Sequence, residues 1–247
     1  MKKIKFVICY DGSHVNGWHG TNGVFVKNLL QDAFYKITQE NTIFYCCGRT
    51  DSGVHALKQT VHCTYELIIS IDKMKNAMNF YLPKFIRILQ CDLVDNKFHS
   101  RFSSLYRKYM YKIYLSKETN PFIENYALRI SYDINIKLMQ SLMQQLIGIF
   151  DFKSFCHGKY KGSTVKQMDN CYLEKGSDNL GNQTIELFFQ SKSFAHHQIR
   201  NLVGGILYVG KGLWSIEDFF IVLNKKHRKF GPPMMQPKAL YFLESGY

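Results

Sequence analysis

The chain has 247 residues and carries 32 Lys and Arg against 19 Asp and Glu, which gives a formal net charge of +13. Its length allows one large domain or two closely packed halves, and its positive charge favours a nucleic-acid partner because it attracts phosphate groups of any sequence. Seven cysteines without a C-x-x-C pair argue against a disulfide framework or a zinc site, and no apolar stretch approaches the length of a transmembrane helix.

The start of the chain and its aromatic content bear on the compartment and on the partner of this protein. The apolar run at residues 4–10 stops at Asp11-Gly12, which is too short for the hydrophobic region of a signal peptide. No basic amphipathic helix stands out that would suit an anionic membrane. Aromatic residues make up 15% of the chain, so rings that could stack on unstacked bases are present. We therefore expect a cytoplasmic RNA-binding protein with no membrane partner.

Apolar periodicity predicts the elements before residue 104. Alternation indicates strands, and apolar residues at i, i+3 and i+4 indicate helices with one buried face. Asp72 is a candidate N-cap for the second helix, and alternation places Val61 and Cys63 on the face of their strand opposite to His62. The predicted elements are a strand at 3–10, a helix at 26–37, strands at 43–47 and 57–64, a helix at 72–81 and a strand at 85–93.

A similar set of elements is predicted after residue 105. The strand at 106–115 places Arg107, Tyr109 and Tyr111 on one face, and Ser215 and Asp218 have the spacing of a capping box. The predicted elements are that strand, a helix at 135–147 that stops at Gly148, strands at 168–175 and 184–190, helices at 196–209 and from 215 onward, and a strand at 239–244.

These elements predict an α+β fold with two similar α/β halves, residues 1–104 and 105–247. No Pro/Gly/Ser-rich linker separates the halves, so we expect one continuous mixed or antiparallel sheet flanked by helices rather than two free domains.

A glycine-bracketed loop follows the predicted strand at 43–47 and holds three chemically active side chains. Arg49, Asp51 and His55 fall within seven residues, at the edge of a sheet where catalytic side chains often sit. An arginine two positions from Asp51 favours the ionised carboxylate, which suits a nucleophile or a base. The alternative is a surface turn in which Arg49 and Asp51 simply pair.

The nonapeptide Gly48–Ala56 resembles the active-site loop of the TruA family of tRNA pseudouridine synthases. It matches the pattern Gly-Arg-Thr-Asp-x-Gly-Val-His-Ala at every fixed position. The resemblance continues along nearly the whole chain, in Tyr10-Asp11-Gly12 with Gly17-Trp18, Asn79 with Leu82-Pro83, Phe98–Ser103, Arg107–Tyr111, Asp151–Phe155, Phe194–Gly204 and Lys238–Leu243.

The resemblance implies a role for individual residues and a pseudouridine synthase fold with a basic active-site cleft. Asp51 is implied as the catalytic residue, Arg49 as the residue that displaces the target base, Tyr109 as its stacking partner and Arg200 as the ion-pair partner of Asp51. His55 and Leu240 are implied at the substrate. The residues assigned to RNA binding are Arg107, Lys108, His196, Lys225, Lys226 and Arg228.

Two features of the sequence allow a second interpretation. The basic run 225–229 fits a solvated loop as well as a phosphate contact. The pair His196-His197 invites a metal site, but no acidic or cysteine partner lies at ligand spacing, so we expect no metal and interpret both imidazoles as helix-start or RNA-facing groups.

The implied activity is isomerisation of uridine to pseudouridine in the anticodon stem-loop of tRNA, at positions 38 to 40, by a homodimer. The reaction has no net redox change, so we expect no cofactor; whether Asp51 attacks C1′ or removes the C2′ proton stays open. The alternatives are the same chemistry at another RNA site and an RNA-binding protein without activity. Four departures from the family pattern, His19, Lys27, Phe85 and Gln167, concern substrate positioning rather than chemistry.

Overall fold

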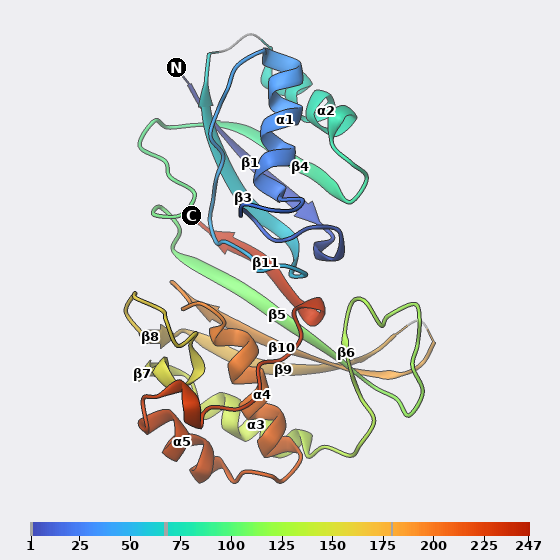
Figure 1. Cartoon of the computed structure of the whole chain (residues 1–247), viewed down its shortest axis with the longest axis vertical. Coiled ribbons are helices and arrows are strands. Elements are labelled where there is room, and N and C mark those ends of the chain that lie inside the picture. The colour runs from blue at the N-terminus through green and yellow to red at the C-terminus, as the bar shows by residue number, and fades with distance from the viewer. Residues whose placement is uncertain (1, 67–68, 179) are drawn as a thin grey trace. The chain divides into compact units, whose positions relative to one another are not determined.

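A computed structural model describes residues 2–66, 69–178 and 180–247 and divides the chain into two compact units (Figure 1). The first unit is Met1–Arg107 with Tyr241–Tyr247, and the second is Lys108–Leu240. The division lies close to the one expected after residue 104, and the last strand of the chain, expected in the second half, belongs almost entirely to the first unit.

The first unit is a mixed sheet with two helices. In its sheet β1 lies between β4 and β3, antiparallel to both, and β3 continues to β11 in parallel and to the short β2. Helices α1 and α2 cover one face of this sheet (Figure 1). The elements are β1 (Lys2–Tyr10), α1 (Val26–Thr38), β2 (Tyr45–Cys46), β3 (His55–Tyr65), α2 (Ile71–Tyr81), β4 (Ile86–Val94) and β11 (Leu240–Gly246).

Alternation in β1 explains how this unit forms its core. Ile4, Phe6 and Ile8 are fully or almost fully buried while the residues between them are half-buried, as a strand with one face toward the helices requires. The ring of Phe44 lies 5.7 Å from the rings of both Phe6 and Phe34, which joins the sheet to α1.

The second unit contains paired strands and the helices described below. Strand β10 lies between β5 and β9, and β6 pairs in parallel with β5. A separate antiparallel pair is formed by β7 and β8. The elements are β5 (Tyr106–Leu115), β6 (Leu128–Ile130), α3 (Ile136–Gln145), β7 (Gly148–Asp151), β8 (Val165–Met168), β9 (Asn170–Ser177), β10 (Gln183–Ser191), α4 (Gln198–Gly210) and α5 (Ile216–Asn224).

Helix α4 is the centre of the second unit. Every residue of it except Tyr208 is buried, and it packs against α3, α5 and the 3₁₀ turn η2 (Phe152–Phe155). Helix α5 begins with the predicted capping box, in which Ser215 and Asp218 each accept a hydrogen bond from the other's backbone N–H.

The α+β class with a mixed sheet flanked by helices is confirmed, with corrections to single elements. Helix α2 has Ser70 at its N-cap position, so Asp72 lies in the first turn, where its charge still complements the helix dipole. Helix α3 ends at Gln145, and Gly148 begins β7 instead of stopping the helix. His62 is buried like Val61, because side chains also cover its face of β3.

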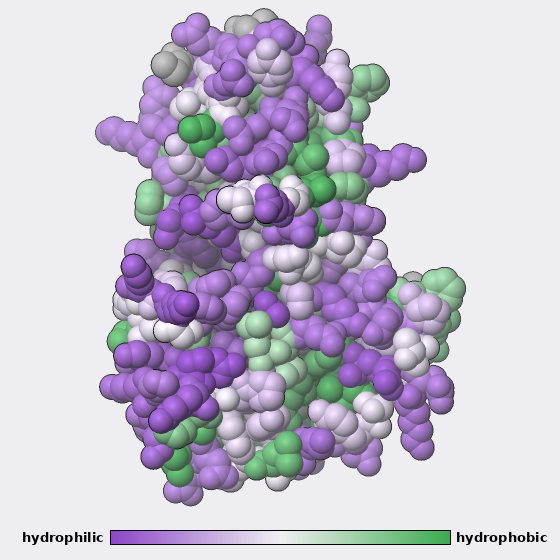
Figure 2. All heavy atoms as spheres, viewed as in Figure 1, coloured by the Kyte–Doolittle hydropathy of each residue, from purple (hydrophilic) through white to green (hydrophobic). Residues whose placement is uncertain are grey.

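Figure 2 shows that hydrophilic side chains cover most of one face of the molecule. Among the described residues, no helix combines the length and the apolarity that crossing a membrane would require.

Candidate active site

Asp51 lies in the loop between β2 and β3. The base of this loop is closed by Gln59, a fully buried side chain whose amide donates to the carbonyl of Gly48 at 2.6 Å. The N–H of Cys47 donates to the carbonyl of Thr60 at 2.8 Å. Asp51 is half-buried and Arg49 is exposed. The carboxylate of Asp51 is therefore partly shielded from solvent, while the guanidinium of Arg49 lies at the exposed rim of the loop.

A second segment, residues 10–18, holds the loop from the other side. The hydroxyls of Tyr10 and Thr50 lie 2.8 Å apart, and the N–H of Trp18 donates to the carbonyl of Thr50 at 3.1 Å. The N–H of Gly53 donates to the carbonyl of Val15 at 3.4 Å. We call residues 10–18 the cradle. Its bonds fix the backbone on both sides of Asp51.

Two glycines let the cradle approach the loop. A Cβ atom on Gly12 would lie 2.2 Å from the carbonyl oxygen of Val54, and one on Gly17 would lie 2.6 Å from that of Thr50. Gly17 also has φ +93°, a conformation that side-chain-bearing residues rarely adopt. The resemblance marked both glycines, and the structure gives the physical reason for them.

His55 supports the loop from inside the sheet. It is 2% exposed, its Nδ1 accepts the N–H of Gly12 at 3.0 Å, and its ring stacks on Tyr241 at 4.7 Å between centroids. Asp11 Oδ1 lies 3.2 Å from the same nitrogen. These contacts place His55 as a residue that positions the loop, so its implied place at the substrate stays a prediction.

Three of the departures from the family pattern surround the loop. Burial lowers the pKa of His19, and the positive charges of Arg49 and Lys27 lower it further, which favours a neutral imidazole beside two cationic side chains. The ring of Phe85 stacks on His14 at 4.9 Å, and its carbonyl accepts the N–H of Asp11 at 2.9 Å. The fourth departure, Gln167, is exposed in β8 of the second unit.

Arg107 lies in the first unit and is buried. Its Nε and Nη2 donate to the carbonyl of Cys47 at 3.2 and 3.0 Å, and its Nη2 also donates to the carbonyl of Arg101 at 2.6 Å. This arrangement supports the start of the Asp51 loop and differs from the exposed placement that a direct phosphate contact needs.

The remaining expected site residues belong to the second unit. Tyr109, on β5, is 8% exposed and meets Phe194 edge to face at 5.2 Å. Arg200, on α4, is also 8% exposed, and its Nε donates to the carbonyl of Met235 at 2.7 Å. Leu240 is buried. The implied ion pair joins Arg200 of the second unit to Asp51 of the first, and it stays a prediction.

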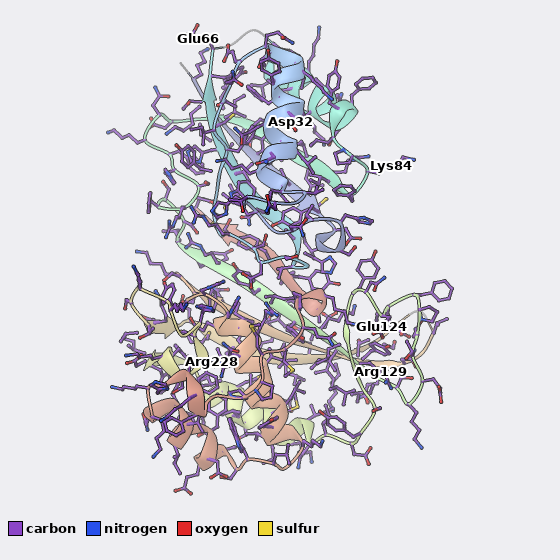
Figure 3. The ribbon with its side chains drawn as sticks, viewed as in Figure 1. Asp32, Glu66, Lys84, Glu124, Arg129 and Arg228 are labelled. Carbon is purple, nitrogen blue, oxygen red and sulfur yellow. The ribbon has the colours of Figure 1, made fainter. Side chains whose placement is uncertain are left out.

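The residues expected to bind RNA differ in accessibility. Lys225 and Lys226 are exposed, whereas the guanidinium of Arg228 donates to Asn201 Oδ1 at 3.0 Å and to the carbonyl of Pro232 at 2.8 Å. Burial lowers the pKa of Arg228, which lies among the helices of the second unit (Figure 3). Lys108 is half-buried with its ammonium over the rings of Tyr172 and Phe188, and His196 is exposed.

Comparison with known proteins identifies the family that the sequence motifs resemble, and the similarity to individual relatives extends over the whole chain. A family model described as tRNA pseudouridine synthase matches residues 142–247. The chain is 32% identical to a protein named tRNA pseudouridine synthase A from Rhodospirillum centenum, over 253 aligned residues and the full length of both chains. It is also 32% identical, again over both full lengths, to proteins of that name from Thermoanaerobacter sp. and Thermoanaerobacter pseudethanolicus. The chain belongs to the TruA family of tRNA pseudouridine synthases. These are isomerases that convert uridine to pseudouridine.

Membership in the TruA family explains the sequence motifs, while the structure shows features that the motifs alone did not reveal. Gln59 and the hydroxyl of Thr50 anchor the loop, yet neither was singled out. Their partners are distant in the sequence, Tyr10 being 40 positions from Thr50, so no local pattern could have indicated them. His157, which lies beside His196, was missed for the same reason.

Proposed function

We propose that this chain isomerises uridine to pseudouridine in the anticodon stem-loop of tRNA, at positions 38 to 40, with Asp51 as the catalytic carboxylate. The observation that carries the proposal is the full-length similarity to tRNA pseudouridine synthases A, combined with an aspartate on a loop that is fixed on both sides. We also propose that the protein acts as a homodimer in the cytoplasm, as the family resemblance of its motifs implies.

The reaction requires little from the protein beyond one carboxylate held in a fixed position. The bond from C1′ to N1 of the uracil breaks, the base turns, and a bond from C1′ to C5 forms. C5 loses its proton and N1 gains one, so atoms and electrons balance without a redox partner. Asp51 acts either as a nucleophile at C1′ or as a base at C2′. The bonds from the cradle to Thr50 and Gly53 support either role, because a fixed carboxylate needs little reorganisation during the reaction.

The target base has to leave the RNA stack before it can react. Unstacking and unpairing cost a few kcal/mol. Arg49 is exposed at the rim of the loop, where it can enter the space that the base leaves, and Tyr109 supplies a ring for the uracil to stack on. Both contacts would offset the cost of flipping. Exposed lysines such as Lys225 and Lys226 would hold the tRNA by its phosphates.

The proposal is tested by incubating the purified protein with unmodified tRNA transcripts and mapping pseudouridine by carbodiimide-dependent reverse-transcription stops. We expect stops at positions 38 to 40 with the wild-type protein and none with Asp51→Asn. Stops at other positions would keep the chemistry and overturn the proposed target. No stops, with tRNA binding retained, would overturn the enzymatic proposal and favour an RNA-binding protein without activity. The mass of the protein in light scattering tests the homodimer.

A further inference from the structure

Three imidazoles meet in the second unit, from two segments that are far apart in the sequence. One ring nitrogen from each of His157, His196 and His197 lies within 4.8 Å of the other two. The rings of His196 and His197 are 3.7 Å apart, and that of His157 is 5.0 and 5.2 Å from them. We propose that this histidine cluster binds a first-row transition-metal ion, with Zn²⁺ as the representative ion.

The backbone under the cluster is well supported. The N–H of His157 donates to the carbonyl of His196 at 2.9 Å, which ties the two segments directly. One turn into α4, the buried amide of Asn201 donates to the carbonyl of Phe155 at 2.8 Å. His197 has φ +65° at the N-cap position of α4. These contacts hold the backbone of the two segments that carry the three histidines.

The donor set fits the chemistry of such an ion. Neutral imidazole is a preferred ligand of Zn²⁺, Cu²⁺ and Ni²⁺, and three histidines with a fourth position open to water form a common zinc arrangement. With Zn–N bonds of about 2.0–2.1 Å, tetrahedral ligand nitrogens lie roughly 3.4 Å apart. The nitrogens here need to approach by a rotation of the rings. His196 is exposed and the other two are half-buried, so the ion can enter from solvent.

Metal binding at His157 would replace a hydrogen bond that its ring makes with the backbone. The N–H of Lys159 donates to Nδ1 of His157 at 3.2 Å. An ion at Nδ1 replaces this hydrogen bond, and an ion at Nε2 requires a proton on Nδ1, which then no longer accepts from Lys159. In both cases the turn after His157 changes when the metal binds. The backbone amide of Lys159 is therefore a reporter of occupancy.

The test measures Zn²⁺ binding to the metal-free full chain by isothermal titration calorimetry. The main variant is His157→Asn, whose Oδ1 can still accept from the N–H of Lys159 while the imidazole is removed. The matched control is His227→Asn, because Nδ1 of His227 accepts from the N–H of Lys229 at the same 3.2 Å, outside the cluster. All seven cysteines stay in every protein, so thiol binding contributes equally.

We expect the wild type and His227→Asn to bind one Zn²⁺ with equal affinity, and His157→Asn to bind it at least tenfold more weakly. Added Zn²⁺ should raise the melting temperature of the first two proteins only. Equal affinity in all three proteins, or equal losses in both variants, would overturn the proposal. If His157→Asn does not fold, judged by circular dichroism without metal, His196→Ala takes its place with the same expected loss. The readout is metal binding, so it is independent of the proposed enzymatic activity.

Discussion

The backbone N–H of Trp18 donates to the carbonyl oxygen of Thr50 at 3.1 Å, immediately before Asp51 in the chain. A second bond, from Gly53 to Val15, holds the loop just after Asp51. The candidate catalytic residue therefore takes its position from backbone bonds to the cradle as well as from any contact of its own side chain. Disturbing the cradle should affect activity even though the carboxylate is unchanged.

Gly17→Ala tests this dependence. Its Cβ would lie 2.6 Å from the carbonyl oxygen of Thr50, at a residue with φ +93°. We expect the free energy of unfolding to fall by roughly 2–4 kcal/mol and pseudouridine formation at saturating tRNA to fall at least tenfold in the fraction that remains folded. The measurements are urea unfolding and single-turnover kinetics.

The matched control is Gly212→Ala. Gly212 has φ +75° but nothing within 4 Å of an added Cβ, so it isolates the cost of the left-handed backbone, about 1–2 kcal/mol. Turnover should stay at the wild-type level. If both variants lose turnover equally, the close approach of Gly17 to the loop is not what positions Asp51.

Asp51→Asn removes the charge of the proposed catalytic group with almost no change in volume. Product formation should become undetectable, because the amide can serve neither as nucleophile nor as base, while the Kd for tRNA stays within a few-fold. The control is Asp32→Asn, which alters an exposed carboxylate on α1 (Figure 3) and should leave both quantities unchanged. Retained activity in Asp51→Asn would rule out the assignment.

The parts of the fold that depend on local sequence patterns could be predicted from the sequence. Alternation in β1 follows from burial of Ile4, Phe6 and Ile8 on one face, and the spacing of Ser215 and Asp218 was enough to locate the start of α5. Strands β7 and β8 were missed because four residues cannot show a period.

The residues of the candidate site could be predicted from a sequence motif, but the contacts that hold them in place could not. The residues that anchor Thr50 come from the cradle, and the partners of His157 come from the start of α4. A single sequence carries no signal for such contacts, because they depend on how distant segments pack. The placement of Arg107 beneath the loop was hidden for the same reason: alternation showed its face of β5 but not the carbonyl of Cys47 that it meets.

Arg200→Lys separates the charge of the proposed ion-pair partner from its geometry. Lysine keeps the positive charge but has no Nε–H to donate to the carbonyl of Met235, which Arg200 contacts at 2.7 Å. We expect kcat to fall at least tenfold in Arg200→Lys and further in Arg200→Ala, with smaller changes in the Kd for tRNA. Arg129→Lys is the control, since Arg129 also donates to a backbone carbonyl, that of Lys117 at 2.9 Å. Unchanged kcat in both Arg200 variants would argue against a role beside Asp51.

The exposed pair Lys225 and Lys226 allows the phosphate contact to be tested directly. The affinity for tRNA should fall steeply as salt rises, and each lost phosphate contact should reduce the slope of log K against log salt by somewhat less than one. The double variant Lys225→Gln/Lys226→Gln should therefore show a shallower slope. Its control, Lys73→Gln/Lys75→Gln, changes two exposed lysines of α2. Equal slopes in both double variants would identify residues 225–226 as part of a solvated loop.

His62 gives a prediction about stability and pH. Its pKa is lowered to about 4, chiefly by burial and also by the nearby His99 and Lys3. The unfolded chain, in which the pKa of histidine is about 6.5, binds more protons than the folded chain between these two values. The contribution of His62 to stability is thus fully present above pH 6.5 and is lost as the pH falls toward 4.

The measurement is urea unfolding at pH 7.0 and pH 5.0, followed by the fluorescence of Trp18, which is buried in the same unit as His62, in a Trp214→Phe background. His62→Gln also loses the contact of Nδ1 with the hydroxyl of Ser100, 2.8 Å away, so the quantity to compare is the change between the two pH values. That change should be smaller in His62→Gln than in the wild type and in the exposed control His227→Gln. An equal change in all three proteins would show that burial of neutral His62 does not cause the loss of stability in acid.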